Sequence, residues 1–199
     1  MRVGILGGTF DPVHLGHLIV AEEARVRLEL DRVIFIPTGH PWLKQHQPVA
    51  SGADRLRMVE LAIGSNSAFQ VSSNELDRTG PTYTVETLQE LTKELGSDAV
   101  LHFIMGMDTL EQFDRWKEPE KLLNLCHLAI VNRPGHQSVD VNDLVKRYPQ
   151  AGTRLTLLSV PRIEISSTEI RQRVAEGISI RYLVPDAVEG YIGQYKLYR

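Results

Sequence analysis

Six short apolar runs rich in β-branched residues recur along the chain and constrain its fold more than any other feature. Segments with helical periodicity lie between most of them. The runs occupy residues 2–6, 32–36, 69–72, 100–105, 127–132 and 154–160. Near-continuous apolar runs are typical of strands buried on both faces, and their alternation with helices indicates parallel strands joined by crossovers. The pattern therefore predicts an α/β fold, an open doubly wound parallel sheet with helices on both faces.

The length of the chain predicts one domain over residues 1–199. A chain of 199 residues fits the usual size of a single domain and can bury a sizeable core. The pattern after Pro161 becomes helical, and two last helices are predicted over 166–177 and 185–195. We expect this helical portion, from about 162 to 199, to belong to the same domain.

Composition and charge exclude several classes of protein. No apolar run approaches the roughly 20 residues that a membrane-spanning helix needs, so we expect no membrane partner. A net charge of −3 argues against extended nucleic-acid binding, which requires a basic surface. The apolar stretch at the N-terminus is too short for a signal peptide, and the lone Cys126, predicted to be buried, fits a reducing compartment. The expected location is the cytoplasm, and nothing in the sequence excludes a homo-oligomer.

The segment "GGTFDPVHLGH", residues 7–17, connects the first predicted strand to the first predicted helix. A glycine-rich turn at this place normally binds phosphate, because glycine lets the backbone approach the anion and the helix N-terminus presents N–H groups. The spacing Gly4-x-x-Gly7-Gly8 differs from the G-x-G-x-x-G dinucleotide fingerprint, and the G-x-x-x-x-G-K-[ST] loop of ATPases is also missing. The sequence therefore predicts a different kind of phosphate-binding turn, one that carries histidines.

Two histidines in this segment, His14 and His17, are predicted to share one face of a helix that begins near Val13. Gly16 removes a side chain between them. Three interpretations follow: one histidine caps the helix while the other packs, the two bind zinc, or both imidazoles donate hydrogen bonds to a polyphosphate. Zinc is disfavoured because no H-E-x-x-H or C-x-x-C motif supplies further ligands.

"TFDPVHLGH", residues 9–17, resembles the signature of the nucleotidyltransferase superfamily, and "ISSTEIR", residues 165–171, resembles the superfamily's motif for the β- and γ-phosphates of ATP. The resemblance implies a Rossmann-like sheet of the nucleotidyltransferase type. A helix that begins near Thr168 would offer free N–H groups, two hydroxyls and Arg171 to these phosphates. Ser166 and Glu169 also have the spacing of a capping box, and both interpretations are compatible.

Three further stretches resemble the bacterial nicotinate mononucleotide adenylyltransferases. They are "GPTYTVETL" (80–88), "FIMGMDTLEQFDRW" (103–116) and "VNRPG" (131–135). The resemblance implies that Trp116 stacks on the pyridine ring, that Tyr83 and Thr84 orient the nicotinate end, that Asp108 binds a ribose and that Arg133 meets phosphate. It assigns ATP to Gly7, Gly8, Thr9, Phe10, His14, His17, Gly106, Asp108, Ser167, Thr168 and Arg171.

The loop after the second predicted strand departs from the family pattern. The family commonly has IPxxxPPHK there, whereas this chain has "IPTGHPWLK", with Leu43 in place of the histidine. Lys44 stays in register and is expected to contact the phosphates. Whether His40 or His46 replaces the missing histidine is left open by the sequence.

The resemblance implies transfer of the adenylyl group of ATP to nicotinate mononucleotide, which gives deamido-NAD and pyrophosphate. His14, His17, Lys44 and Arg171 would stabilise the reacting phosphates, together with a Mg²⁺ bound mainly through ATP. Lys117 is hypothesised to favour the carboxylate of nicotinate mononucleotide over the amide of nicotinamide mononucleotide. The alternatives are an acceptor such as nicotinamide mononucleotide or pantetheine phosphate, and a nucleotide-binding regulator without catalysis.

Overall fold

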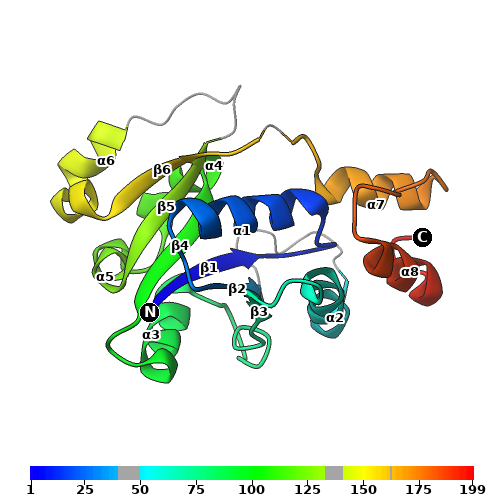
Figure 1. Cartoon of the computed structure of the whole chain (residues 1–199), viewed down its shortest axis with the longest axis horizontal. Coiled ribbons are helices and arrows are strands. Elements are labelled where there is room, and N and C mark those ends of the chain that lie inside the picture. Colours follow the sequence, from blue (N-terminus) through cyan, green and yellow to red (C-terminus); the bar gives the residue numbers. More distant parts are fainter. Residues whose placement is uncertain (40–49, 133–140, 162) are drawn as a thin grey trace.

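The computed structural model describes residues 1–39, 50–132, 141–161 and 163–199, and these contain one parallel sheet of six strands (Figure 1). The strands are β1 (Arg2–Gly8), β2 (Arg32–Pro37), β3 (Phe69–Val71), β4 (Val100–Gly106), β5 (Cys126–Asn132) and β6 (Leu155–Ser159). Each begins and ends within two residues of an apolar run in the sequence. The predicted strands and the parallel α/β class are confirmed.

The order of the strands in the sheet is β3-β2-β1-β4-β5-β6, and every neighbouring pair is parallel. The chain builds outward from β1 to β3 and then returns to place β4 on the other side of β1. In such sheets ligands bind beyond the carboxyl ends of the strands at the point where the order reverses. A ligand site is therefore expected at the loops after β1 and β4.

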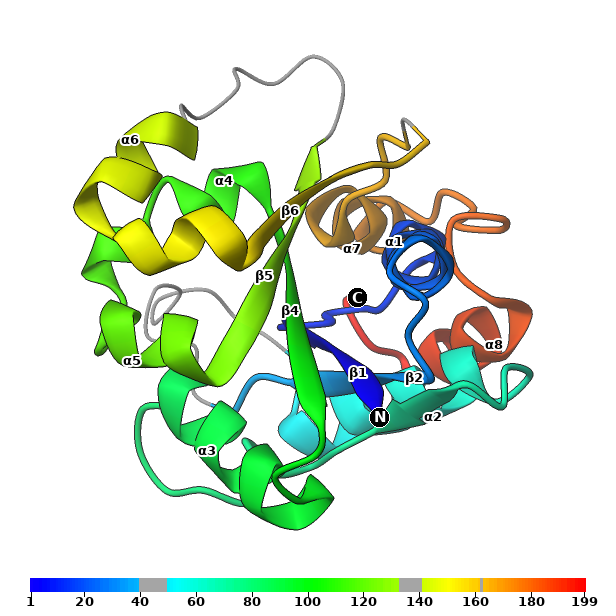
Figure 2. The same ribbon diagram turned by 60° about the vertical axis from the view of Figure 1, so that its left-hand side comes forward.

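One face of the sheet is covered by the first two and the last two α-helices (Figure 2). These are α1 (Leu15–Arg27), α2 (Gly52–Ile63), α7 (Ser167–Ala175) and α8 (Asp186–Tyr195). Ala24 of α1, Met58 of α2, Ile170 of α7 and Val188 of α8 are all fully buried members of the same apolar cluster. Because α7 and α8 share this core with β1, the end of the chain packs beside its beginning.

The opposite face is covered by helices from the middle of the chain. They are α3 (Thr84–Leu95), α4 (Met107–Leu110), α5 (Pro119–Leu125) and α6 (Val141–Arg147), with the short 3₁₀ helices η1 (Phe113–Arg115) and η2 (Pro149–Thr153). Leu88, Leu122 and Leu144 bury their side chains in a second apolar cluster on this side. Two cores, one on each face, explain why the strands are apolar on both sides.

The predicted helices at the end of the chain are confirmed, but the predicted start of α1 near Val13 is wrong by two residues. The helix begins at Leu15, and His14 is the N-cap with an extended backbone (φ −143°, ψ 170°). An N-cap residue leaves the helical conformation while its carbonyl accepts the first helical bond, and the His14 carbonyl accepts from the His17 N–H at 2.9 Å. The two histidines are therefore the N-cap and the third helical residue.

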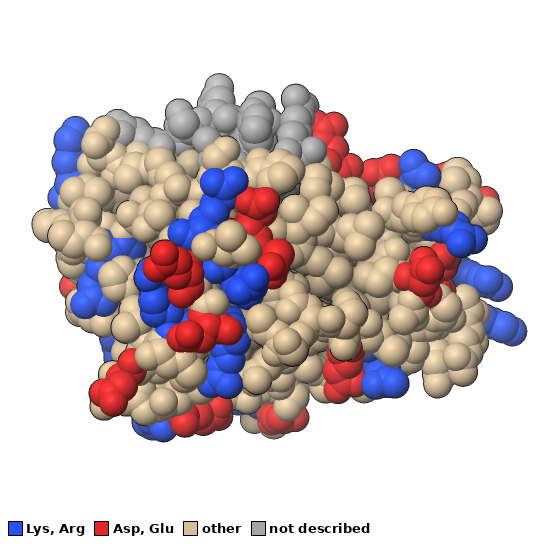
Figure 3. All heavy atoms as spheres, viewed as in Figure 1, with Lys and Arg blue, Asp and Glu red and all other residues tan. Residues whose placement is uncertain are grey.

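Cys126 is 1% exposed at the start of β5, as predicted, and burial raises the pKa of its thiol to about 12. None of the helices in the described part of the chain is long and apolar enough to cross a membrane. Basic and acidic side chains lie interspersed on the face shown in Figure 3, where α1 carries the ion pairs Glu22–Arg25 and Glu23–Arg27.

Candidate active site

A pocket of about 400 Å³ opens at the carboxyl ends of β1 and β4, where the strand order reverses. Its lining combines the loop after β1, the start of α1, the ends of β2 and β4, and the first residues of α3, α4 and α7. Predicted site residues in the lining are Gly7, Gly8, Thr9, Phe10, His17, Thr84, Gly106, Asp108, Trp116 and Ser167. Segments from both ends of the sequence and from its middle thus share one cavity.

The turn after β1 brings backbone close to the pocket. Phe10 adopts a left-handed conformation (φ 50°) with its ring buried, 5.8 Å from the Phe35 ring. A Cβ on Gly8 would lie 3.0 Å from the Phe10 ring, so a larger residue at position 8 would have to displace this aromatic. The turn therefore needs glycine for close packing, and it leaves the backbone of residues 7–10 along the pocket wall.

His14 and His17 form a stacked pair at the N-terminus of α1. Their ring centroids lie 3.7 Å apart with an interplanar angle of 26°. The backbone N–H of His14 donates to Nδ1 of His17 at 3.2 Å. Because an accepting Nδ1 carries no proton, neutral His17 holds its proton on Nε2. The fold thus orients His17 as a hydrogen-bond donor through Nε2.

The two histidines are not equally placed toward the pocket. His17 is half-buried and belongs to the lining, whereas His14 is 3% exposed and does not. A Cβ on Gly16 would lie 3.0 Å from Nδ1 of His14, so glycine at this position leaves room for the buried ring. The buried ring of His14 thus stacks against the ring of His17, and His17 lines the cavity.

The start of α7 meets the turn after β1 across more than 150 residues of sequence. Oγ of Ser167 donates to the carbonyl oxygen of Pro12 at 2.9 Å. The guanidinium of Arg171 donates to the carbonyl oxygen of Asp11 at 2.8 Å and to Oγ1 of Thr168 at 3.3 Å. The two stretches that resemble phosphate-binding motifs are therefore in direct contact. Ser167 lines the pocket, whereas Thr168 and Arg171 lie outside the lining.

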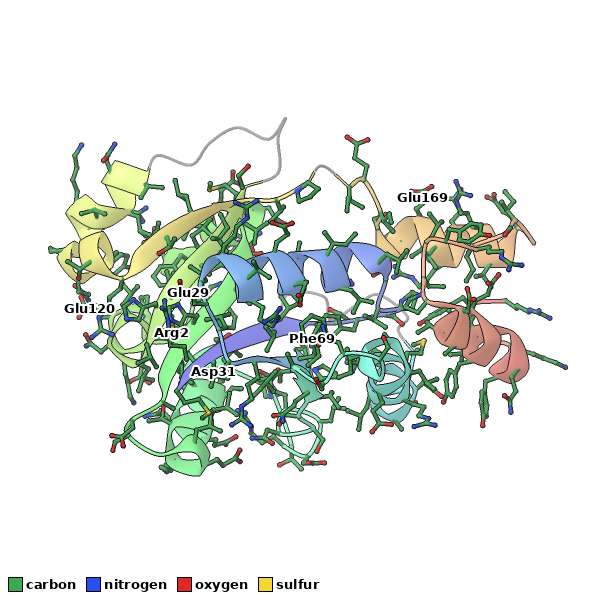
Figure 4. The ribbon with its side chains drawn as sticks, viewed as in Figure 1. Arg2, Glu29, Asp31, Phe69, Glu120 and Glu169 are labelled. Carbon is green, nitrogen blue, oxygen red and sulfur yellow. The ribbon has the colours of Figure 1, made fainter. Side chains whose placement is uncertain are left out.

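The N-cap of α7 forms as the sequence predicts. Glu169, however, does not make the reciprocal contact of a capping box. Oγ of Ser166 accepts from the Glu169 N–H at 3.1 Å. The carboxylate of Glu169, labelled in Figure 4, instead accepts from Nε of Arg173 at 3.0 Å. Helix α7 begins at Ser167, within one residue of both predicted starts, 166 and 168.

Trp116 provides an aromatic wall at the end of the pocket formed by α3 and η1. Its ring lies 5.7 Å from Phe103, at an interplanar angle of 79°, and 5.9 Å from Phe113, at 35°. These contacts fix the half-buried indole while it still lines the cavity together with Thr84. Asp108 lines the same cavity from α4 with an exposed carboxylate, a good partner for sugar hydroxyls.

Tyr83 and Lys117 lie outside this lining and against each other. The Lys117 ammonium is 4.3 Å from the centre of the Tyr83 ring and donates to Oε1 of Glu86 at 2.7 Å. The hydrogen bond to Glu86 raises the pKa of Lys117. Since Glu86 neutralises this charge, the structure gives no support to the hypothesis that Lys117 selects the acid form of the acceptor.

The sequence analysis missed Glu75, a buried carboxyl group in the pocket wall. Oγ1 of Thr87 donates to it at 2.8 Å, and burial is the largest cause that raises its pKa. The guanidinium of Arg78 donates to the same Thr87 oxygen at 2.7 Å. No motif or period in the sequence signals Glu75, because its role depends on contacts between β3, α3 and the end of β2.

Four side chains considered in the sequence analysis lie outside the described residues. They are the predicted phosphate ligands Lys44 and Arg133 and the alternative histidines His40 and His46; Leu43 lies there too. Within the described ranges, no three His, Cys, Asp or Glu side chains come together in a way that could hold a metal ion.

The chain is similar to known proteins over nearly its whole length. A family model described as cytidylyltransferase-like matches residues 5–173. A probable nicotinate-nucleotide adenylyltransferase of Dehalococcoides mccartyi is 44% identical over 198 residues, covering 100% of this chain and 97% of the relative. A protein of the same description from a Roseiflexus species is 48% identical over 197 residues, covering 99% of this chain and 98% of its own.

A solved structure of similar fold is the nicotinic acid mononucleotide adenylyltransferase of Plasmodium falciparum complexed with NaAD. It superposes with a TM-score of 0.78 at 22% sequence identity, and the match covers 99% of this chain and 97% of that one. At this identity the likeness concerns the fold, and it shows that the doubly wound sheet with its C-terminal helices is shared.

Proposed function

This chain belongs to the nicotinate-nucleotide adenylyltransferases of the cytidylyltransferase-like family, and from that premise we propose that it transfers the adenylyl group of ATP to nicotinate mononucleotide. The products are deamido-NAD and pyrophosphate, a step of NAD biosynthesis. The observation that carries this proposal is the contact between residues 11–12 and residues 167–171 beside His17, because it unites both phosphate-binding segments at one pocket.

The reaction needs no base to generate its nucleophile. The 5′-phosphate of the mononucleotide is already anionic at neutral pH, and it attacks the α-phosphorus of ATP as pyrophosphate leaves. What the protein must do is hold two anions together and stabilise the charge that develops on the leaving group. A pocket with a histidine donor, a helix N-terminus and a nearby guanidinium fits that task.

The ATP phosphates are assigned to the two segments that meet at the pocket. The backbone of residues 7–10 cradles the triphosphate, and His17 donates from Nε2 to a phosphate oxygen. The start of α7, with Ser167, Thr168 and Arg171, binds the β- and γ-phosphates. His14 stays a predicted phosphate ligand, and in the structure its backbone N–H fixes the His17 tautomer.

The acceptor is assigned to the aromatic end of the pocket. Trp116 offers a face to the flat pyridine ring, and Thr84 borders the same space. Asp108 is placed to bind ribose hydroxyls, and Tyr83 would act through its position at the start of α3. The roles of Lys44 and Arg133 stay predictions from the family resemblance.

A magnesium ion fits this site as a partner of ATP. Mg²⁺ is commonly held mainly by phosphate oxygens, so the ion would be bound largely through ATP, and Asp108 in the pocket lining is a candidate protein ligand. When bound, Mg²⁺ would neutralise part of the phosphate charge. We further propose that residues 1–199 act as one cytoplasmic domain, and a homo-oligomer stays a prediction.

Pyrophosphate release with ATP and each candidate acceptor tests the proposed function. We expect rapid release with nicotinate mononucleotide, slower release with nicotinamide mononucleotide and none above background with pantetheine phosphate. The indole wall on Phe103 and Phe113 favours a flat aromatic acceptor over a flexible one. Release with none of the three acceptors would support the regulator that binds nucleotide without catalysis and would contradict the proposal.

A further inference from the structure

Asp11, directly before the proline of the turn, is a buried carboxylate that several distant segments contact. It is 2% exposed. Its Oδ1 accepts from the Ala50 N–H at 3.0 Å and from the hydroxyl of Tyr198 at 2.7 Å. Ala50 precedes α2, and Tyr198 is the residue before the last of the chain. One carboxylate oxygen thus links the turn after β1 to the segment before α2 and to the segment after α8.

The other carboxylate oxygen of Asp11 forms a long ion pair with Arg171 but no hydrogen bond to it. Oδ2 lies 3.7 Å from the Arg171 guanidinium and has no hydrogen-bond partner among the described residues. The same guanidinium donates instead to the backbone carbonyl of Asp11 at 2.8 Å. A rotation of the carboxylate toward Arg171 would form a charge-assisted pair, which is stronger than a bond to a neutral carbonyl. Two bonds on Oδ1 oppose that rotation.

A buried cation, Arg55, also interacts electrostatically with Asp11. Arg55 is also 2% exposed, and its guanidinium donates to the carbonyl oxygens of Thr9 at 2.8 Å and of Ala50 at 3.2 Å. Burial lowers the pKa of Arg55, and the attraction of Asp11 acts in the opposite direction. The buried carboxylate of the turn thus interacts with a guanidinium from α2 and with one from α7, and Arg171 is the more exposed of the two, with 23% of its side chain accessible.

Tyr198 is well placed to control which contact Asp11 makes. It follows α8, and the adjacent Leu197 packs against the apolar core beneath α1. Burial and the bond to Asp11 raise the pKa of the Tyr198 hydroxyl, which keeps it protonated as a donor. Its hydroxyl therefore holds Oδ1 throughout the neutral pH range.

We propose that Tyr198 is a positioning residue for the ATP-phosphate site: by binding Oδ1 of Asp11, it keeps the long ion pair between Asp11 and Arg171 from closing into a hydrogen bond and leaves the charge of Arg171 to the phosphates. The proposal rests on the proposed function, in which Arg171 binds the β- and γ-phosphates of ATP. It extends the site to the last residues of the chain, which touch neither substrate.

The test is Tyr198→Phe, which removes one hydroxyl and keeps the ring. We expect the KM for ATP to rise about tenfold, the usual size of a lost hydrogen bond to a charged group, while the KM for nicotinate mononucleotide stays unchanged. Tyr195→Phe is the matched control, because Tyr195 lies exposed on α8 against the Tyr191 ring and should leave both constants unchanged. Equal KM values for ATP in Tyr198→Phe and the wild type would overturn the proposal.

A double variant separates charge competition from simple packing. Asparagine at position 11 carries no charge with which to attract Arg171, so Tyr198→Phe should add no further increase in KM for ATP in the Asp11→Asn background. The same fold-increase in both backgrounds would show that Tyr198 acts only by packing and would overturn the proposal. If Asp11→Asn fails to fold, a crystal structure of Tyr198→Phe decides: Oδ2 of Asp11 should move to within about 3 Å of Arg171, and an unmoved carboxylate contradicts the mechanism.

Arg171→Gln distinguishes failure of this inference from failure of the proposed function. An unchanged KM for ATP in Arg171→Gln would refute the assignment of Arg171 to the phosphates, and the proposal would fall with it. A raised KM in Arg171→Gln together with an unchanged KM in Tyr198→Phe would refute the role of Tyr198 alone.

Discussion

Two stacked pairs of histidines lie at opposite ends of the same sheet and have different surroundings. His14 and His17 stack at 3.7 Å at the start of α1, beyond the carboxyl end of β1. His102 and His127 stack at 5.1 Å with an interplanar angle of 22°, and they face each other in the register of β4 and β5 near the amino ends of these strands. Ring geometry alone does not separate the two pairs.

The environment of each pair separates them. His17 borders the pocket and accepts a hydrogen bond at Nδ1, whereas His102 is 5% exposed and does not line that pocket. Burial lowers the pKa of His102 to about 4, and the nearby charges of His127 and Arg2 act in the same direction. Figure 4 shows Arg2 with Glu29 and Asp31 at the start of β1, far from Glu169 on α7. The comparison teaches that a histidine pair suits anion binding where a helix start and a cavity accompany it.

The largest expected effect that would test this contrast is on turnover. His17→Ala should lower kcat by about 100-fold or more and change the KM for ATP much less, because a donor to the developing charge matters most in the transition state. His127→Ala is the matched control from the other pair and should keep kcat within about twofold of the wild type. Steady-state pyrophosphate release measures both. Near-normal turnover in His17→Ala, or an equal loss in His127→Ala, would erase the distinction between the pairs.

The second effect concerns the stability of the protein at low pH, and it arises from His102 in the pair of His102 and His127. An unfolded chain binds a proton at His102 below about pH 6.5, whereas the folded protein binds it only near pH 4. The unfolded state therefore gains the proton first, and the free energy of unfolding falls as the pH decreases through this window. We expect the titration of His102 to lower the free energy of unfolding by about 2 kcal/mol as the pH falls from 7 to 5.

The variant His102→Phe checks this dependence, because phenylalanine fills a similar space and does not titrate. Urea unfolding at several pH values should show a flatter decrease between pH 6.5 and pH 4 in the variant, with unchanged turnover at neutral pH. If the variant and the wild type lose stability in parallel, His102 is not the group responsible.

The smallest of the three effects tests how tightly the pair at the pocket is packed. Gly16→Ala adds a Cβ that would lie 3.0 Å from Nδ1 and 3.1 Å from Cε1 of His14, so the ring must shift by a few tenths of an ångström. We expect kcat to fall about tenfold through misplacement of the pair. Gly190→Ala on α8 is the control, since its Cβ would meet no atom within 4 Å. Equal kcat values in Gly16→Ala and the wild type would show that the pair tolerates movement.

Local patterns in the sequence predicted most of the fold. The six strands were predictable because burial on both faces leaves few polar positions in a run such as "RVIFI", which became β2. His17 was predictable because its motif is continuous in sequence. The start of α1 was placed two residues too early, since the extended conformation of His14 depends on tertiary contacts such as the bond from the Leu15 N–H to the Leu183 carbonyl.

Local sequence patterns did not predict contacts between distant segments. Arg171 was predicted from a family resemblance, but its bond to Asp11, 160 residues earlier, and the bond from Tyr198 follow only from the packing of α7 and α8 on the core that they share with the turn after β1. The pair His102 and His127 likewise depends on the register of β4 and β5. Glu75 carries no pattern at all, and its place in the pocket wall follows from the elements around it.

The central claim is that the turn after β1 and the start of α7 hold one triphosphate between them. A crystal structure with a non-hydrolysable ATP analogue tests it most directly. We predict phosphate oxygens within about 3.2 Å of both Nε2 of His17 and the Ser167–Arg171 segment, with the innermost phosphorus open toward Trp116. A triphosphate bound elsewhere, in contact with neither His17 nor the start of α7, would contradict the account.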